Sequence, residues 1–165
     1  DLKTLGIRSI MLTGDNPSTA KAIAGQVGID DVQANLLPED KLKVISELGQ
    51  TQQTGMVGDG VNDSPSLAAA SVGFSMGGAG TDTAKEAADV LIMNDDLRKV
   101  PETIRLSKRT HAILWQNIVL ALGIKAVFFV LAVFGSATMW MAVFADMGAS
   151  LLVVFNGLRL LKSPR

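Results

Sequence analysis

The distribution of charge constrains this chain more than any other feature of its sequence. Of its 15 basic and 16 acidic residues, only Lys125 and Asp146 fall within residues 110–158. Two hydrophobic runs, at about 112–134 and 138–158, fill this stretch, and each is long enough for a helix to cross a hydrocarbon core of about 30 Å. Core helices of a soluble protein are the alternative, but helices of that length normally have a polar face, which neither run has. The sequence therefore predicts a two-helix transmembrane hairpin.

Basic residues flank the hairpin and predict its orientation. They are Lys108, Arg109, Arg159, Lys162 and Arg165, while the turn between the two runs carries no charge. Because positive charge is concentrated on the cytoplasmic side of membrane helices, both ends of the hairpin are expected in the cytoplasm. We therefore predict a cytoplasmic domain at 1–95, a connecting helix at 96–111, the two spans within 112–158 and a cytoplasmic tail at 159–165.

The overall composition says little about partners. A net charge of −1 gives no reason to expect nucleic-acid binding, and the chain has no cysteine that could bind a metal as thiolate. No secretory signal opens the chain, which begins at Asp1 within an amphipathic approach to a predicted strand. We interpret it as a fragment of a longer polypeptide.

Short apolar runs alternate with helical stretches in the charged region. Helices are predicted to begin at Pro17 and Pro38, because proline is favoured at the first helical position, and Gly28 ends the first of them. Two further helices are expected over 63–70 and 81–88. The runs predicted as strands are 8–12, 32–36, 54–57, 71–75 and 89–93. This alternation is typical of an α/β domain with a parallel sheet.

A polar loop at residues 13–16 follows the first predicted strand, at the sheet edge where α/β domains bind their ligands. Thr13 offers a hydroxyl group, Gly14 lets the backbone come close to a ligand, and the next helix directs its first N–H groups toward the same place. Glycine, aspartate and asparagine are also common in structural turns. Taken alone, the loop is therefore compatible with either interpretation.

A second polar loop, at 58–63, is more specific. It holds two carboxylates four residues apart, Asp59 and Asp63, with Asn62 between them and Gly60 permitting a tight turn. Magnesium is usually bound by one or two carboxylates, with water and phosphate completing the octahedron. Asp59 is the predicted ligand because it leaves the strand first. Together the two loops predict magnesium-dependent phosphoryl transfer, which relies on positioning and charge stabilisation.

Three segments resemble successive motifs of the P-type ATPase phosphorylation domain, a Rossmann-like domain of the haloacid-dehalogenase-like fold. They are residues 13–16 (Thr-Gly-Asp-Asn), 38–41 (Pro-Glu-Asp-Lys) and 58–65 (Gly-Asp-Gly-Val-Asn-Asp-Ser-Pro). The resemblance covers essentially the whole chain and implies Mg²⁺ and ATP as cofactors. Departures from residues common in the family occur at Val57, Ser64 and Ser66, and none of these positions supplies an essential ligand in the family pattern.

The resemblance also implies roles for the polar residues of these motifs. The threonine and aspartate of the first motif line the phosphate site, and the lysine of the second contacts the aspartyl-phosphate. The first aspartate of the third motif binds magnesium, while its asparagine and second aspartate complete the site around metal, phosphate and water. The implied site residues are Thr13, Gly14, Asp15, Lys41, Asp59, Asn62 and Asp63. Without the resemblance, the lysine is interpreted as a solvated helix residue.

The nucleophile of the family, an aspartate followed by Lys-Thr-Gly, does not occur in this sequence. Asp40 precedes a lysine, but Leu42 follows and the segment lies on a predicted helix, so it is no substitute. The nucleotide-binding domain, the actuator domain and the other membrane helices are expected elsewhere in the same polypeptide. We expect this chain alone to form no aspartyl-phosphate and to hydrolyse no ATP.

Lys125 and Asp146 are predicted to lie at matching depth in the bilayer. Lys125 precedes Ser136, at the tip of the hairpin, by 11 residues, and Asp146 follows it by 10. Charges near the bilayer centre cost about 2.5–3.5 kcal/mol each, so they are usually paired or functional. A structural ion pair is one interpretation, and a ligand for a transported cation is the other, since Asp146 is the only carboxylate in the two runs. Asn117 and Asn156 are candidate partners in a hydrogen bond between the helices.

The hairpin resembles the last two membrane helices of heavy-metal pumps that export zinc, cadmium and lead. The similar segments are residues 123–125 (Gly-Ile-Lys) and 146–150 (Asp-Met-Gly-Ala-Ser). The resemblance implies that Asp146 is a transport ligand and that Lys125 can act as its counter-ion. Copper pumps of the same branch carry a tyrosine in these helices, and this chain has none. The methionines at 139, 141 and 147 are interpreted as lipid-facing or packing residues.

These features predict an ATP-driven exporter of soft divalent metal in a prokaryotic plasma membrane, with its soluble part in the cytoplasm. Its partners would be the transported ion, the lipid bilayer and the rest of the same polypeptide. One alternative is a P-type pump for copper, potassium or calcium, and another is a membrane-anchored phosphatase of the dehalogenase-like fold. The pair of charges in the hairpin favours transport, because a mere anchor gains nothing from them.

Overall fold

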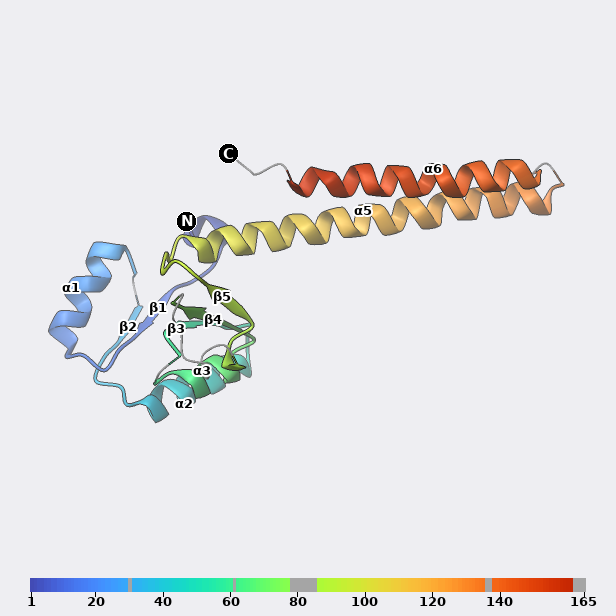
Figure 1. Ribbon diagram of the computed structural model, residues 1–165. Coiled ribbons are helices and arrows are strands. Elements are labelled where there is room, and N and C mark those ends of the chain that lie inside the picture. The colour runs from blue at the N-terminus through green and yellow to red at the C-terminus, as the bar shows by residue number, and fades with distance from the viewer. Residues whose placement is uncertain (30, 61, 78–85, 136–137, 162–165) are drawn as a thin grey trace. The chain divides into compact units, whose positions relative to one another are not determined.

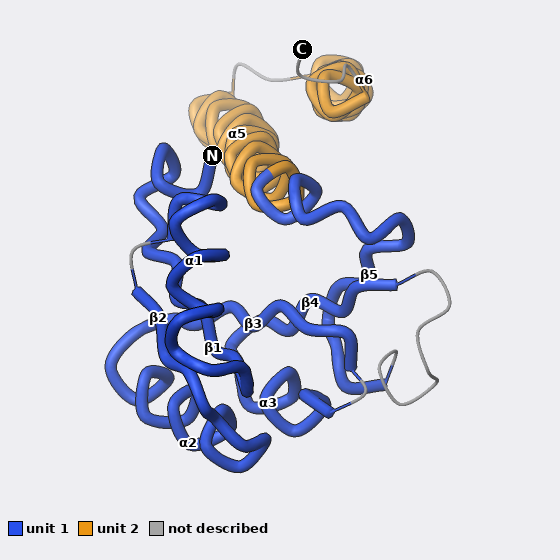
Figure 2. Tube along the Cα trace, turned by 90° about the vertical axis from the view of Figure 1, so that its left-hand side faces the viewer, with its two compact units in different colours: residues 1–101 blue, residues 102–165 orange. Residues whose placement is uncertain are grey.

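The computed structural model describes residues 1–29, 31–60, 62–77, 86–135 and 138–161. The chain divides into two compact units, Asp1–Pro101 and Glu102–Arg165, which Figure 2 shows in blue and orange. Unit 1 holds all the described strands and the short α-helices, and unit 2 consists mainly of two long helices (Figure 1).

The described strands of unit 1 are short, parallel and arranged in two hydrogen-bonded sheets. Strand β1 (Ile10–Leu12) pairs with β2 (Asp31–Gln33). Strands β3 (Gly55–Gly58), β4 (Val72–Met76) and β5 (Val90–Ile92) form the second sheet in that order. Parallel pairing agrees with the predicted α/β class, while the described strands form two sheets where one was predicted.

Two of the predicted helices begin where proline and capping residues indicate. Helix α1 (Pro17–Val27) has its first turn capped by Asn16, whose Oδ1 accepts a hydrogen bond from the Thr19 amide at 2.9 Å. Helix α2 (Pro38–Gly49) begins with Asp40 Oδ2 accepting from the Leu37 amide at 2.9 Å. Helix α3 (Ser64–Ala69) follows β3. The helix predicted over 81–88 lies mostly outside the described residues.

The core of unit 1 joins the second sheet to the helices. Ile45 of α2, Met56 of β3 and Leu67 of α3 are buried and in contact, and each stabilises the fold by about 1.5–3 kcal/mol. Leu12 of β1 packs against the same cluster. Both sheets therefore share one core, although no hydrogen bonds between strands join them in the described residues.

The predicted strand 32–36 is too long at its C-terminal end. Asn35 has a positive φ of 56°, which ends extended structure there. Its amide donates to the carbonyl of Asp15 at 2.9 Å, and the Leu36 amide donates to the carbonyl of Thr13 at 3.0 Å. The apolar pattern alone missed that these amides fasten the loop after β1 instead of continuing β2.

Unit 2 is a helical hairpin. Helix α5 (Lys99–Val133), whose first turn belongs to unit 1, and helix α6 (Met139–Leu158) lie side by side (Figure 1), and a short 3-10 helix, η2 (Arg159–Leu161), follows. Thr138 caps α6 by accepting from the Met141 amide. By length and composition both α5 and the segment from α6 through η2 could cross a membrane, and most of their large apolar side chains are exposed. Such exposure is expected of helices that face lipid or further helices.

We expect Gly73→Ala to lower the free energy of unfolding by about 1–3 kcal/mol, as overpacking does in a core. A Cβ at this position in β4 would lie 2.8 Å from the Leu67 carbonyl oxygen, a backbone atom that cannot move aside by itself. Thermal melting of the detergent-solubilised protein measures the effect. Gly25→Ala in α1 is the matched control, because its Cβ would meet nothing within 4 Å. Equal melting of the Gly73 variant and the parent would contradict the expected clash.

Candidate functional site

The loop after β1 is held in one conformation by its own polar groups. Thr13 Oγ1 donates to Asp15 Oδ2 at 3.1 Å and accepts from the Asp15 amide at the same distance. A Cβ on Gly14 would lie 3.3 Å from the Leu36 carbonyl oxygen, so the close approach of the two loops favours glycine. The loop thus presents the predicted threonine and aspartate at the carboxyl end of β1, with Asp15 exposed.

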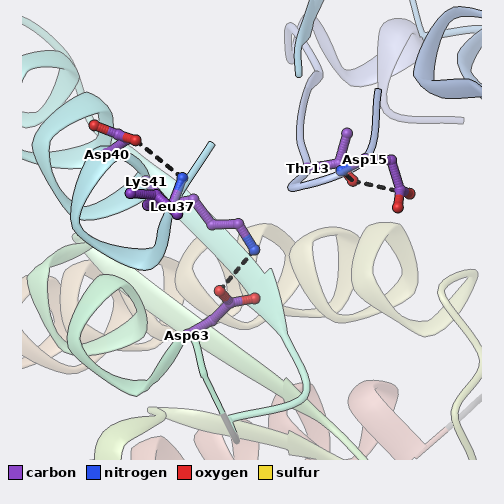
Figure 3. A network of polar contacts seen from close by, with 6 residues as sticks. All are labelled: Thr13, Asp15, Leu37, Asp40, Lys41 and Asp63. Atoms are coloured by element: carbon purple, nitrogen blue, oxygen red, sulfur yellow. Dashed lines mark hydrogen bonds and ion pairs between the residues drawn. The ribbon is translucent and has the colours of Figure 1, made fainter. Parts of the chain in front are cut away.

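Lys41 and Asp63 form an ion pair between α2 and the start of α3. Lys41 Nζ lies 2.8 Å from Asp63 Oδ1, and only 16% and 15% of the two side chains are exposed. Figure 3 shows the lysine extending from α2 toward the carboxylate. Because little solvent reaches the pair, its attraction is screened weakly. The interpretation of Lys41 as a solvated helix lysine is therefore wrong.

Asp63 occupies the N-cap position of α3 without using its side chain as the cap. Aspartate in this position commonly accepts from an amide of the first turn, and here its carboxylate instead accepts from Lys41. A Cβ on Gly58 would lie 3.2 Å from Asp63 Cβ, so glycine at the end of β3 leaves the room that Asp63 fills. The local backbone thereby places the carboxylate against the strand end.

The remaining residues of the second loop lie close to this strand end. Asp59 directly follows β3, and both it and Asn62 are exposed. Gly60 has a φ of 73°, and its carbonyl accepts a hydrogen bond from the Ser64 hydroxyl. The loop is thus anchored to the first residue of α3 while Asp59 stays accessible.

The donor groups at this strand end suit a hard cation. Asp59 and Asp63 provide carboxylate oxygens, and neither histidine nor cysteine lies in the loop. Among the described residues there is no group of three or more His, Cys, Asp or Glu that could hold a metal. Magnesium needs only one or two carboxylates when water and phosphate complete its shell, so the residues present fit Mg²⁺.

Sequence reasoning missed that Lys41 and Asp63 contact each other. The signal available was topological: the first turn of a helix that precedes a parallel strand lies near the loop that follows that strand. The close approach of Gly58 to Asp63 had no signal in the residue pattern, because it depends on the turn between them.

In unit 2 the structure brings the two charged residues of the apolar runs together. Lys125 Nζ of α5 lies 3.8 Å from Asp146 Oδ1 of α6, and about two thirds of each side chain is exposed, 67% and 68%. A groove of about 300 Å³ beside the pair is lined largely by alanine and phenylalanine. The Ser150 hydroxyl donates to the Asp146 carbonyl within α6 at 2.9 Å, so it is already engaged. Asp146 supplies the carboxylate oxygens that line this groove.

Comparison with known proteins places both units in one class. Residues 1–71 match the family model described as haloacid dehalogenase-like hydrolase, and unit 1 has the α/β fold of that family. Over 98% of its length the chain is 55% identical to a probable cadmium-transporting ATPase of Alkalihalophilus pseudofirmus. It is 48% identical, again over 98%, to the zinc/cadmium/lead-transporting P-type ATPase of Escherichia coli.

A solved structure agrees with these relatives. The crystal structure of a zinc-transporting PIB-type ATPase in the E2.Pi state superposes with a TM-score of 0.88 and 47% identity, covering 98% of this chain and 26% of that one. The chain belongs to the heavy-metal-transporting subfamily of the P-type ATPases. It spans 22% of the length of each of the two relatives named above.

Proposed function

We propose that this chain is the part of an ATP-driven metal exporter that carries half of the phosphorylation domain and two membrane helices, with zinc, cadmium or lead as the cargo. The observation that carries the proposal is the match of relatives with these named cargoes across both units, at about half identity. The contact between Lys125 and Asp146 within apolar helices supports it, because such charges are costly unless they serve a purpose.

Unit 1 is proposed to prepare the site for phosphoryl transfer. Bound Mg²⁺ would offset negative charge on the phosphate of ATP or of the phosphorylated enzyme. Asp59 is the proposed ligand, accessible at the end of β3, and Asp63 is held beside it by Lys41. The Thr13 hydroxyl, whose one proton is donated to Asp15 here, would have to turn away from that carboxylate to donate to a phosphate oxygen. The aspartate that accepts the phosphate would come from another part of the same polypeptide.

Four residues around Thr13 and Asp63 have supporting parts in this proposal. Asp15 holds the Thr13 side chain at the loop through their mutual hydrogen bonds before phosphate binds, and Gly14 between them leaves space at the loop. Asn62, exposed beside Asp63, offers an amide for the water or phosphate at the site. The Lys41 ammonium group would contact the phosphoryl group as well as the Asp63 carboxylate, and so would offset part of the negative charge on both.

Unit 2 is proposed to contribute a ligand to the transported ion. Asp146 would bind the metal, and Lys125 would neutralise the carboxylate when the metal has left. Both helices would cross a prokaryotic plasma membrane, and their ends away from the hairpin turn would lie in the cytoplasm. Further membrane helices of the polypeptide would complete the coordination shell.

The proposal predicts that zinc, cadmium or lead ions stimulate ATP hydrolysis by the full-length protein, whereas Cu⁺, K⁺ and Ca²⁺ do not. The reason is that a carboxylate paired with an ammonium group in this hairpin accompanies relatives named for the first three metals. Phosphate release by purified protein in detergent, with each ion added in turn, measures the stimulation. Stimulation by Cu⁺ alone, or hydrolysis independent of every ion, would support the copper pump or the anchored phosphatase instead.

A further inference from the structure

A polar cluster joins α5 and α6 near the ends of unit 2 opposite the hairpin turn. Asn156 of α6 lies at its centre: its Nδ2 donates to Asn117 Oδ1 at 2.9 Å and to Gln116 Oε1 at 3.3 Å, both on α5. The hydrogen bond predicted between Asn117 and Asn156 is thereby confirmed. Gln116 was not predicted, although its position beside Asn117 was an available signal.

Arg159 fixes which way the Asn156 amide points. Arg159 Nη1 donates to Asn156 Oδ1 at 2.9 Å, and because a guanidinium group can only donate, the amide oxygen must face it. The amide NH₂ is then directed at the two acceptors on α5. Arg109 of α5 in turn donates to the Arg159 carbonyl, one of the carbonyls that the end of a helix leaves without an intrahelical partner.

The distance along the helix from the polar cluster to the charged residue is similar in α5 and α6. Lys125 lies eight residues beyond Asn117 on α5, and Asp146 lies ten residues before Asn156 on α6. At 1.5 Å per residue these separations are about 12 and 15 Å. Because the helices are antiparallel, a bond between Asn117 and Asn156 brings the two charged residues to nearly the same level.

The charged pair has little tolerance for a change in register. Lys125 Nζ and Asp146 Oδ1 are 3.8 Å apart, close to the limit of about 4 Å for an ion pair. A slip by one residue would move one helix along the other by about 1.5 Å and would weaken this contact. Most of the remaining surface is apolar and exposed, and apolar contacts fix a register less specifically than directional hydrogen bonds do.

We propose that Asn156 is a positioning residue that holds α5 and α6 in the register in which Lys125 faces Asp146. Asn117 is its main partner, and Arg159 keeps its amide correctly oriented. The consequence for metal binding rests on the proposed function, since the register would set where the Asp146 carboxylate meets the ion. The register itself is a property of the hairpin and can be tested without any metal.

Zero-length cross-linking tests the register directly. A membrane-permeant carbodiimide activates the Asp146 carboxyl group, and the Lys125 amine displaces the urea to form an amide only if the two groups are in contact. We expect this cross-link in the full-length protein, detected by mass spectrometry, and a severalfold lower yield in Asn156→Leu, which keeps the approximate shape but cannot donate. Asn117→Leu should lower the yield similarly, and combining both changes should add little further.

Thr110→Val is the matched control, because the Thr110 hydroxyl donates to the Leu106 carbonyl of its own helix and forms no hydrogen bond to the described residues of α6. An undiminished cross-link in Asn156→Leu would overturn the proposal. So would an equal loss of cross-link in Thr110→Val, which would show general disruption of the hairpin.

The zinc dependence of ATP hydrolysis separates positioning from a merely structural role. In Asn156→Leu the zinc concentration for half-maximal stimulation should rise by about three- to tenfold, the effect of one hydrogen bond between membrane helices, while the rate at saturating zinc changes less. A lower rate with unaltered zinc dependence would overturn the link to the ion site. If the parent protein shows the cross-link but no stimulation by zinc, the proposed function fails and the register assignment stands.

Discussion

Replacing Asp146 by alanine is expected to lower the apparent zinc affinity of the full-length protein by roughly 30-fold or more, so that stimulation of ATP hydrolysis is lost at low zinc concentrations. The change removes the carboxylate that is proposed to bind the ion, and with it the attraction between this negative charge and the metal cation. Truncating one member of a desolvated charge pair costs about 2–5 kcal/mol, which corresponds to this loss or a larger one. Zinc-dependent phosphate release by the purified protein measures it.

Ser150→Ala is the control for this experiment. Ser150 lies one turn from Asp146, but its hydroxyl is bonded to the Asp146 carbonyl within α6, so its removal should leave the zinc dependence almost unchanged. Unaltered stimulation of the Asp146 variant by zinc would remove this residue from the ion site. In that case the pair of charges would be structural.

Replacing Asp59 by asparagine should reduce magnesium-dependent phosphorylation of the full-length protein by at least about 100-fold. Loss of residues that merely orient metal ligands already costs about 10–100-fold, and Asp59 is proposed to bind the ion itself. The side chain is exposed directly after β3, so the substitution removes charge without opening the core. Incorporation of labelled phosphate from ATP, titrated with Mg²⁺, measures the effect.

Asp40→Asn provides a control with the same loss of charge on the same unit. Asp40 accepts from the Leu37 amide at the start of α2, and asparagine can make the same hydrogen bond. Its phosphorylation should therefore match that of the parent protein. Normal phosphoenzyme in the Asp59 variant would exclude this residue as a magnesium ligand and leave Asp63 as the candidate.

The local chemistry of unit 1 was largely predictable from the sequence. Proline and asparagine at the start of α1 act within one turn, so the local sequence is sufficient to predict where that helix begins. The end of β2 was not predictable, because Asn35 and Leu36 bond to a loop about twenty residues earlier in the chain. Which strands pair was also beyond the pattern: apolar runs indicate strands but do not specify that the described strands form two sheets.

The candidate sites show the same division. Nearly equal spacing from the turn, 11 and 10 residues, was enough to predict that Lys125 and Asp146 come together, because the two helices of a hairpin run antiparallel. The partner of Lys41 depended on how α2 and α3 pack, which no spacing within either helix encodes. The sequence thus indicated which residues carry the chemistry, but it did not indicate that Lys41 and Asp63 contact each other and are largely buried.

The exposure of the charged pair also bears on how the hairpin is made. Two thirds of Lys125 and Asp146 remain uncovered when α5 and α6 are considered by themselves. Newly synthesised helices that present such groups to lipid tails insert with a cost that their mutual attraction offsets only in part. The hairpin is therefore expected to stay an unstable insertion intermediate, accessible to membrane proteases, until neighbouring helices of the polypeptide cover the two side chains. The charges that we propose for transport would then also make biosynthesis of the hairpin depend on completion of the pump.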